Sequence, residues 1–114
     1  MAARSAPTVR AKYGNVRGRI DGITFDSMAE GERYIVLRDR LQKGEILDLE
    51  CHPSFRLEIN GVLICRYVAD FAYVTSDGIQ VIEDVKGVKT AAYQIKRKLM
   101  KAVHGITITE VMVR

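Results

Sequence analysis

The segment that most constrains the fold is Val81 to Lys86, an apolar run interrupted by three ionisable side chains. Its β-branched residues are typical of a strand, and we predict one over 79–86. Because side chains alternate along a strand, Asp84 and Lys86 share one face while Glu83 points to the other. A carboxylate and an amine are costly to bury without a partner or a function. The segment therefore predicts both a strand and a chemical site.

A second acid, Asp70, interrupts another apolar run, which predicts one long strand over 62–74. Both faces of that run are largely apolar, as expected for a central strand. Asp70 then needs a metal ion, a cation or a place at the sheet rim to be tolerated. A turn at 76–78 would bring this strand beside 79–86. Two carboxylates and a lysine joined in this way predict a site for a divalent metal ion and a nucleophilic water.

The remaining pattern predicts a mixed α/β (α+β) fold. The expected elements are a hairpin with strands over 16–19 and 23–25, a helix from Asp26 or Ser27 to about 43, strands over 45–51, 55–59, 62–74 and 79–86, a helix over about 90–103 and a strand over 106–113. Asp21-Gly22 and Asn60-Gly61 are hairpin-turn signals, the second of type I′. The final strand–helix–strand crossover implies that at least two strands are parallel. Ala91, Ile95 and Leu99, with Ala102 or Val103, form the expected buried stripe of the second helix.

The start of the first helix carries a third acid. Ser27 followed by Glu30 fits a capping box. Glu30 also falls in line with Tyr34, Leu37 and Leu41, the expected inward stripe of this helix. Glu30 therefore has two compatible interpretations: a capping carboxylate that stabilises the helix, and an acid that reaches toward Asp70 and Asp84.

The length and composition of the chain are those of one ordinary globular domain. We expect a flexible basic arm over 1–12 and a single domain over 13–114. Hydrophobic residues make up 47% of the chain and charged residues 28%, which is an ordinary balance for a globular protein. No apolar run approaches the roughly 18 residues of a membrane span. The first residues lack the apolar region of a secretory signal, and the two cysteines fit reduced thiols. These features predict a cytoplasmic protein with no membrane partner.

Positive charge is concentrated in two segments. Residues 1–19 and 89–104 contain arginines and lysines but no acid, although the net charge is only +4. Such segments favour a polyanionic partner, and the plainer alternative is a solvated basic face.

The three acids and the lysine resemble the PD-(D/E)XK nuclease superfamily. Asp70 stands where that superfamily has its first acid, although Ala69 replaces the proline of its name. Asp84-Val85-Lys86 matches the (D/E)XK half of the motif, and Glu30 resembles the helical acid that precedes the core strands. The implied fold is a restriction-endonuclease-like core, a mixed central sheet flanked by two helices, with an N-terminal hairpin added here.

Over about residues 12–113 the chain is also similar to a small family of phage and prophage proteins assigned to this superfamily. The segments that carry the similarity are Lys12 to Asn15, Phe25 to Ser27, Glu30 to Tyr34 and Glu83 to Gly87. Two aspartates and a lysine in this order are only weakly specific for the superfamily. Their expected place on adjacent strands after a Ser-X-X-Glu helix is much more specific.

The resemblance implies a chemistry that suits these residues. Asp70, Asp84 and the Val85 carbonyl would bind Mg²⁺ or Mn²⁺, with Glu30 as a direct or water-mediated ligand. Lys86 would orient or deprotonate the attacking water. Strand alternation disfavours Glu83 in place of Asp84, although a β-bulge would reverse this. The residues expected to contact DNA are Gln94, Lys96, Lys98, Lys101, Lys12, Arg17 and Arg19.

The resulting hypothesis is a Mg²⁺-dependent DNA endonuclease, selective for branched or recombination intermediates such as Holliday junctions in phage DNA metabolism. With no spare domain for reading sequence, recognition by DNA shape is expected, on branched or duplex DNA. A possible homodimer, needed for symmetric cleavage of two strands, stays open. The alternative is a DNA-binding recombination accessory protein with the same fold and no turnover. A nuclease that acts on RNA is a third possibility.

Overall fold

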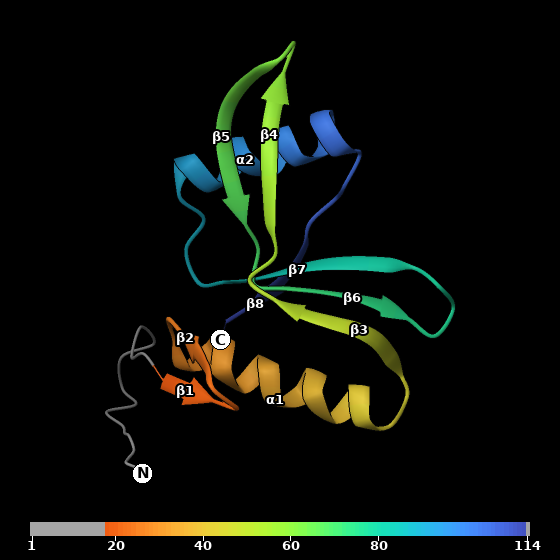
Figure 1. Cartoon of the computed structure of the whole chain (residues 1–114). Coiled ribbons are helices and arrows are strands. Elements are labelled where there is room, and N and C mark those ends of the chain that lie inside the picture. Colours follow the sequence, from red (N-terminus) through yellow and green to blue (C-terminus); the bar gives the residue numbers. More distant parts are fainter. Residues whose placement is uncertain (1–17, 114) are drawn as a thin grey trace.

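The computed structural model describes residues 18–113, so the expected arm over 1–12 and the candidate contacts Lys12 and Arg17 lie outside the described residues. The described chain is a compact α+β fold with two helices, a mixed sheet and an N-terminal hairpin, as predicted (Figure 1). Its elements are β1 (Gly18–Ile20), β2 (Ile23–Phe25), α1 (Met28–Gln42), β3 (Ile46–Cys51), β4 (Ser54–Ile59), β5 (Val62–Val68), β6 (Phe71–Thr75), β7 (Gln80–Lys86), α2 (Ala91–His104) and β8 (Thr109–Met112).

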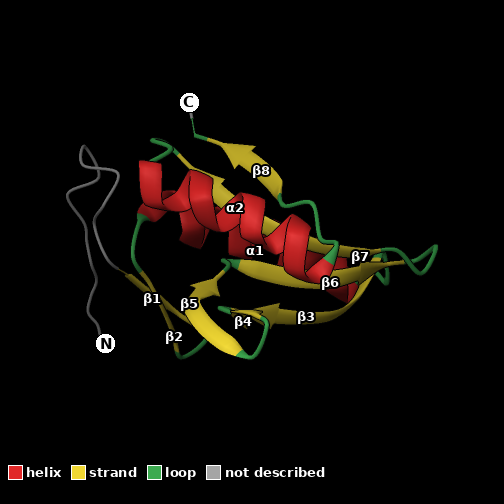
Figure 2. Cartoon of the chain, turned by 90° about the horizontal axis from the view of Figure 1, so that it is seen from above, coloured by secondary structure: helices red, strands yellow, loops and turns green. Residues whose placement is uncertain are grey.

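The main sheet has four strands in the order β3-β6-β7-β8. Figure 2 shows β3 and β8 at its two edges, with β6 and β7 between them. β6 pairs antiparallel with β3 and with β7, whereas β7 and β8 are parallel. The parallel pair confirms the predicted crossover, in which α2 returns the chain to the same sheet.

The sheet separates two layers. α1 and the β1–β2 hairpin lie on one side, and α2 and the β4–β5 hairpin lie on the other (Figure 1). Each layer has its own apolar core. The core on the α1 side is built from Phe25, Tyr34, Leu37, Ile46, Phe71 and Tyr73. The core on the α2 side is built from Leu57, Tyr67, Ala69, Ala72, Ile82, Tyr93, Met100 and Ile108.

Local sequence signals determine the turns and helix ends. Ser27 is the N-cap of α1, and its hydroxyl oxygen accepts a hydrogen bond from the Glu30 backbone at 3.2 Å. Both residues of the Asp21-Gly22 and Asn60-Gly61 turns have positive φ, as a type I′ turn requires. Gly105 ends α2 in the left-handed conformation, with φ of 70°.

The prediction of one long central strand over 62–74 is wrong. The chain breaks at Ala69 and Asp70: β5 pairs only with β4, and β6 enters the main sheet. At the break the Ala69 N–H donates to the Pro53 carbonyl, and the Asp70 N–H donates to the Glu83 carbonyl. The backbone therefore changes partners there, and much of β5 lies at the surface.

The predicted helix faces also need correction. The buried residues of α2 are Tyr93 and Met100, while Ala91 and Ile95 are exposed. Leu99 and Val103 are partly buried against the core on the α2 side. On α1, Tyr34 and Leu37 are buried as expected, but Leu41 is exposed because it lies in the last turn of the helix. The last strand is shorter than the predicted 106–113.

Cys51 and Cys65 are free thiols. Within residues 18–113, no helix is both long enough and apolar enough to cross a membrane.

Candidate functional site

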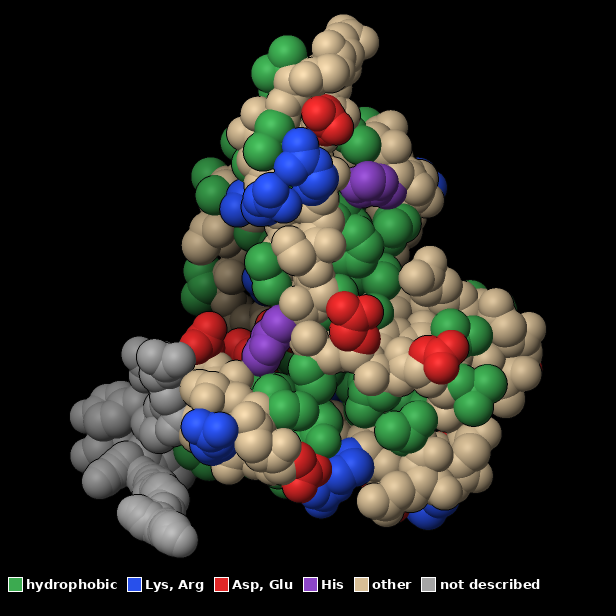
Figure 3. Space-filling view, in the orientation of Figure 1, with side chains coloured by type: hydrophobic (Ala, Val, Ile, Leu, Met, Phe, Trp, Pro, Cys, Tyr) green, Lys and Arg blue, Asp and Glu red, His purple; other side chains and the backbone are tan. Residues whose placement is uncertain are grey.

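Four polar side chains from three local features lie near the middle of the molecule. Asp70 lies at the break between β5 and β6, and Asp84 and Lys86 lie on one face of β7. Glu30 lies in the first turn of α1, close to the end of the sheet. In Figure 3, acidic side chains and a histidine lie at the narrow junction between the upper and lower parts of the molecule.

Asp84 is buried, with 3% of the residue exposed. Its Oδ2 atom accepts a hydrogen bond from the hydroxyl of Tyr67, which comes from β5. The same oxygen lies 3.5 Å from Lys86 Nζ. Lys86 Nζ also lies 4.0 Å from the centroid of the Tyr93 ring, a cation–π contact. Both groups of the D-X-K pair are therefore fixed in position by aromatic residues.

Asp70 is held against the backbone of β7. Its Oδ2 atom accepts a hydrogen bond of 2.7 Å from the Val85 N–H. Burial raises the pKa of Asp70 to about 8, and a hydrogen bond with the Asp84 carboxyl and the negative charges of Asp84 and Glu30 contribute to the rise. At neutral pH Asp70 therefore holds a proton in this arrangement.

Glu30 completes the acidic group. Its side chain is only 15% exposed. Burial raises the pKa of Glu30, and the charges of Asp26 and Asp84 add to the rise, while the charge of His52 opposes it. His52 Nε2 lies 3.8 Å from Glu30 Oε1. The capping and inward-reaching interpretations of Glu30 are thus compatible in this geometry.

The acidic group does not form a finished metal site. Among residues 18–113, no three His, Cys, Asp or Glu side chains are arranged as a ready set of metal ligands. The chemistry of the donors nevertheless suits a hard divalent cation, because three carboxyls share one region and two of them have raised pKa values. The contacts of Asp70 with Val85 and of Asp84 with Tyr67 and Lys86 all use Oδ2. A ligand role for Glu30, Asp70, Asp84 or the Val85 carbonyl stays a prediction.

One comparison with known proteins gives a match. A family model described as "Protein of unknown function (DUF1064)" covers residues 10–111. The chain belongs to the DUF1064 family. No curated protein and no solved structure gives a significant match. The description of the DUF1064 family names no activity, so any function has to be argued from the site itself.

An open cleft gives access to the Asp84 side of this DUF1064 site. Its volume is about 310 Å³. Arg66, Tyr67 and Val68 of β5 line one side, the residues around Thr90 and the first turns of α2 line the other, and Asp84 and Lys86 lie at β7. Lys96 is the only one of the expected DNA-contacting lysines in residues 18–113 that lines it.

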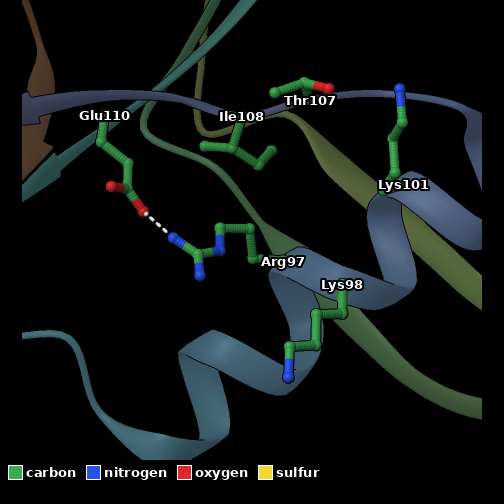
Figure 4. A pocket seen from close by; sticks show the side chains of 6 residues that line it. All are labelled: Arg97, Lys98, Lys101, Thr107, Ile108 and Glu110. Carbon is green, nitrogen blue, oxygen red and sulfur yellow. Dashed lines mark hydrogen bonds and ion pairs between the residues drawn. The ribbon is translucent and has the colours of Figure 1, made fainter.

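The other expected DNA contacts are spread over several surfaces. Lys98 and Lys101 line a separate cavity of about 540 Å³ with Arg97 and Glu110 (Figure 4). Gln94 donates a hydrogen bond to the Lys89 carbonyl at 3.2 Å and does not line the cleft. Arg19 is exposed on β1, on the α1 side of the sheet.

Glu83 lies on the face of β7 opposite to Asp84, as strand alternation predicts, and is held there by side chains of the protein. It is 1% exposed and accepts hydrogen bonds from Arg33 Nε at 2.8 Å and from Arg33 Nη2 at 2.6 Å. The Tyr73 hydroxyl donates a further hydrogen bond to it. A fully paired carboxylate of this kind ties α1 to the sheet.

Three residues of the site were not singled out from the sequence. Neither the aromatic residues Tyr67 and Tyr93 nor Glu110 of the last strand had a role in the predicted site. Glu110 is the register partner of Asp84 across the parallel pair. It accepts hydrogen bonds from Tyr93 at 2.7 Å and Arg97 at 3.0 Å and forms an ion pair with Lys89 at 2.8 Å. The predicted crossover was the available signal, because it places 109–112 beside 83–86.

Proposed function

We propose that this DUF1064 protein is a metal-dependent endonuclease that hydrolyses phosphodiester bonds in DNA. We also propose that the resemblance of Asp70 and Asp84-Val85-Lys86 to the PD-(D/E)XK motif reflects membership of that nuclease superfamily. One observation supports the endonuclease proposal above the others: burial and the charge of Asp84 raise the pKa of both Glu30 and Asp70, and Asp84 itself lies beside Lys86 in an open cleft. Perturbed pKa values combined with a cleft are a feature of catalytic sites.

The accumulated negative charge is unfavourable for the protein alone. Three carboxyls near one another are stabilised when one holds a proton or when a cation is bound. When bound, Mg²⁺ or Mn²⁺ would supply positive charge to the phosphate under attack. Asp70 and Asp84 would hold it, with Glu30 directly or through water and the Val85 carbonyl as a further oxygen donor.

In this proposal Lys86 acts on the attacking water. Its ammonium group is oriented by Asp84 and by the Tyr93 ring, and it faces the cleft. In the proposed reaction, the water oxygen forms a bond to phosphorus as the bond to one sugar oxygen breaks. The departing oxygen takes a proton from solvent, which leaves one hydroxyl end and one phosphate end. As an ammonium, Lys86 would orient the water, whose own proton passes to solvent; as an amine that has first released its proton, Lys86 would accept the proton of the water.

DNA is the proposed substrate because positive side chains border the same cleft. Arg66 and Lys96 both line it. The described chain has no second unit for reading sequence, which supports selection by DNA shape, with branched or recombination intermediates as the proposed targets.

The test is a panel of linear, nicked, flapped and four-way DNA incubated with Mg²⁺ or Mn²⁺. We expect cleavage by the wild-type protein, strongest on a branched substrate, and its loss in Asp84→Asn. Asp77→Asn is the matched control, because Asp77 is an exposed turn residue before β7. Salt-sensitive DNA binding without cleavage on any substrate would overturn the proposal in favour of an accessory protein. Cleavage confined to an added RNA duplex would overturn the choice of DNA.

A further inference from the structure

The β4–β5 hairpin has two different faces. Its inner face carries Leu57 and Tyr67, which pack with Tyr93 and Met100 of α2. Because side chains alternate, Arg56, Arg66 and Val68 lie on the outer face of the hairpin, where Arg66 and Val68 also border the cleft. The hairpin projects from the rest of the molecule, and Figure 3 shows positive side chains gathered on it among apolar ones.

The outer face contains an unusual cross-strand pair. Arg56 on β4 is the direct register partner of Arg66 on β5. Like charges placed directly opposite each other destabilise a two-stranded ribbon. Arg56 has a weak ion pair with Glu58, at 3.6 Å, and Arg66 has no ion pair within residues 18–113. We therefore expect the pair to destabilise the hairpin rather than to hold its strands together.

The arginine pair continues from the cleft at the candidate site. Arg66 and Val68 line that cleft together with Asp84, Lys86 and Lys96. Arg56 lies next to Arg66, one strand farther from the cleft. A row of positive groups thus leads from the proposed reaction centre onto the outer face of the hairpin.

We propose that the outer face of the β4–β5 hairpin binds the phosphate chain of the DNA substrate through Arg56 and Arg66. This inference rests on the proposed function, which identifies the ligand as DNA. It adds a second surface that contacts the same substrate. Neighbouring phosphates follow one another closely along a strand, so two guanidinium groups that lie side by side suit them. Exposed apolar residues beside them, Val68 at 55% and Ile64 at 52%, would contact sugars or bases.

The test compares DNA binding by Arg56→Gln and Arg66→Gln with the wild-type protein, using fluorescent four-way and linear DNA in EDTA so that nothing is cut. We expect each variant to raise the Kd several-fold and to make the slope of log K against log salt shallower by about 0.9 for each phosphate that the variant no longer neutralises. Glu58→Gln should lower the Kd, because it releases Arg56 from its ion pair. The thermal midpoints of the arginine variants should not fall, since the change removes a repulsion.

Lys43→Gln is the matched control, because it removes the same charge from the far end of α1. Unchanged DNA affinity and salt slope in both arginine variants would overturn the inference. A selective loss of binding to polyglutamate, with DNA binding retained, would also overturn it and would assign the surface to an acidic protein.

The DNA-binding test of the arginine variants and the cleavage test of the proposed function can fail independently. DNA binding that depends on the arginines, without cleavage by the wild-type protein, supports the binding surface and contradicts the nuclease. Cleavage with no effect of the arginines contradicts the surface and supports the nuclease.

Discussion

Glu83 and Asp84 are neighbours in β7, but their carboxylates lie on opposite faces of the strand in unlike surroundings. Glu83 is paired with Arg33 of α1, and Asp84 accepts a hydrogen bond from Tyr67 of β5 and lies beside Lys86. The first carboxylate is neutralised within the protein. The second faces a cleft and shares its region with two further acids.

The Arg33–Glu83 pair should contribute mainly to stability. We expect Arg33→Met to lower the free energy of unfolding by about 3–5 kcal/mol, because it leaves a buried carboxylate without its cation. Urea unfolding followed by circular dichroism measures this. Lys43→Met, in an exposed ion pair with Asp39, is the control and should change stability very little. A small effect of Arg33→Met would show that Glu83 is not held as described.

The hydroxyl of Tyr67 should matter for the chemistry more than for the fold. Tyr67→Phe removes the hydrogen bond to Asp84 and keeps the ring in the core. We expect metal affinity or cleavage rate to fall about 10- to 100-fold, as for other groups that orient a metal ligand. The matched control is Tyr73→Phe, whose hydroxyl bonds to Glu83 instead. Equal losses of activity in the two variants, after correction for unfolded protein, would contradict the assignment.

Asp70 should release a proton when a divalent ion binds. Its pKa of about 8 means that Asp70 is mostly protonated at pH 7, and a carboxyl that binds a cation must be ionised. Calorimetric titration with Mn²⁺ in two buffers of different ionisation enthalpy should therefore show release of nearly one proton at pH 7. Asp70→Asn should abolish this release. Identical heats in the two buffers for the wild-type protein would contradict the prediction.

Asp70 should also make the stability of the metal-free protein depend on pH. Its pKa is raised in the folded state above the ordinary value of about 3.9, so the folded protein holds the extra proton between those values. Its contribution to stability is therefore fully present below about pH 4 and is lost as the pH rises toward 8. Thermal midpoints in EDTA should fall over this range, and Asp70→Asn should flatten the fall. A rise of the wild-type midpoint that Asp70→Asn leaves unchanged would contradict it.

Local signals in the sequence account for much of the fold. The Ser27 cap, the two type I′ turns and the alternation that separates Glu83 from Asp84 all depend on near neighbours. The parallel pairing of β7 with β8 follows from the handedness and length of the crossover around α2.

Features that depend on contacts between distant segments could not be predicted from local sequence signals. An apolar run over 62–74 reads as one strand, and nothing within it shows that Ala69 bonds to Pro53 while Asp70 bonds to Glu83. The buried side of α2 was predicted only in part, because Ala91, Ile95 and Leu99 also form an apolar stripe at helical spacing. Packing of the β4–β5 hairpin selects the stripe with Tyr93 and Met100 over the one with Ile95. The aromatic contacts of Asp84 and Lys86 arise from the same packing.

The most direct test of the nuclease is the rate of Mg²⁺-dependent cleavage of a four-way DNA junction at saturating protein, compared between the wild-type protein and Lys86→Met. We predict cleavage that needs the divalent ion and falls at least about 100-fold in Lys86→Met, while Lys43→Met cleaves at the wild-type rate. Equal rates for the wild-type protein and Lys86→Met, or cleavage that persists in EDTA, would contradict the account.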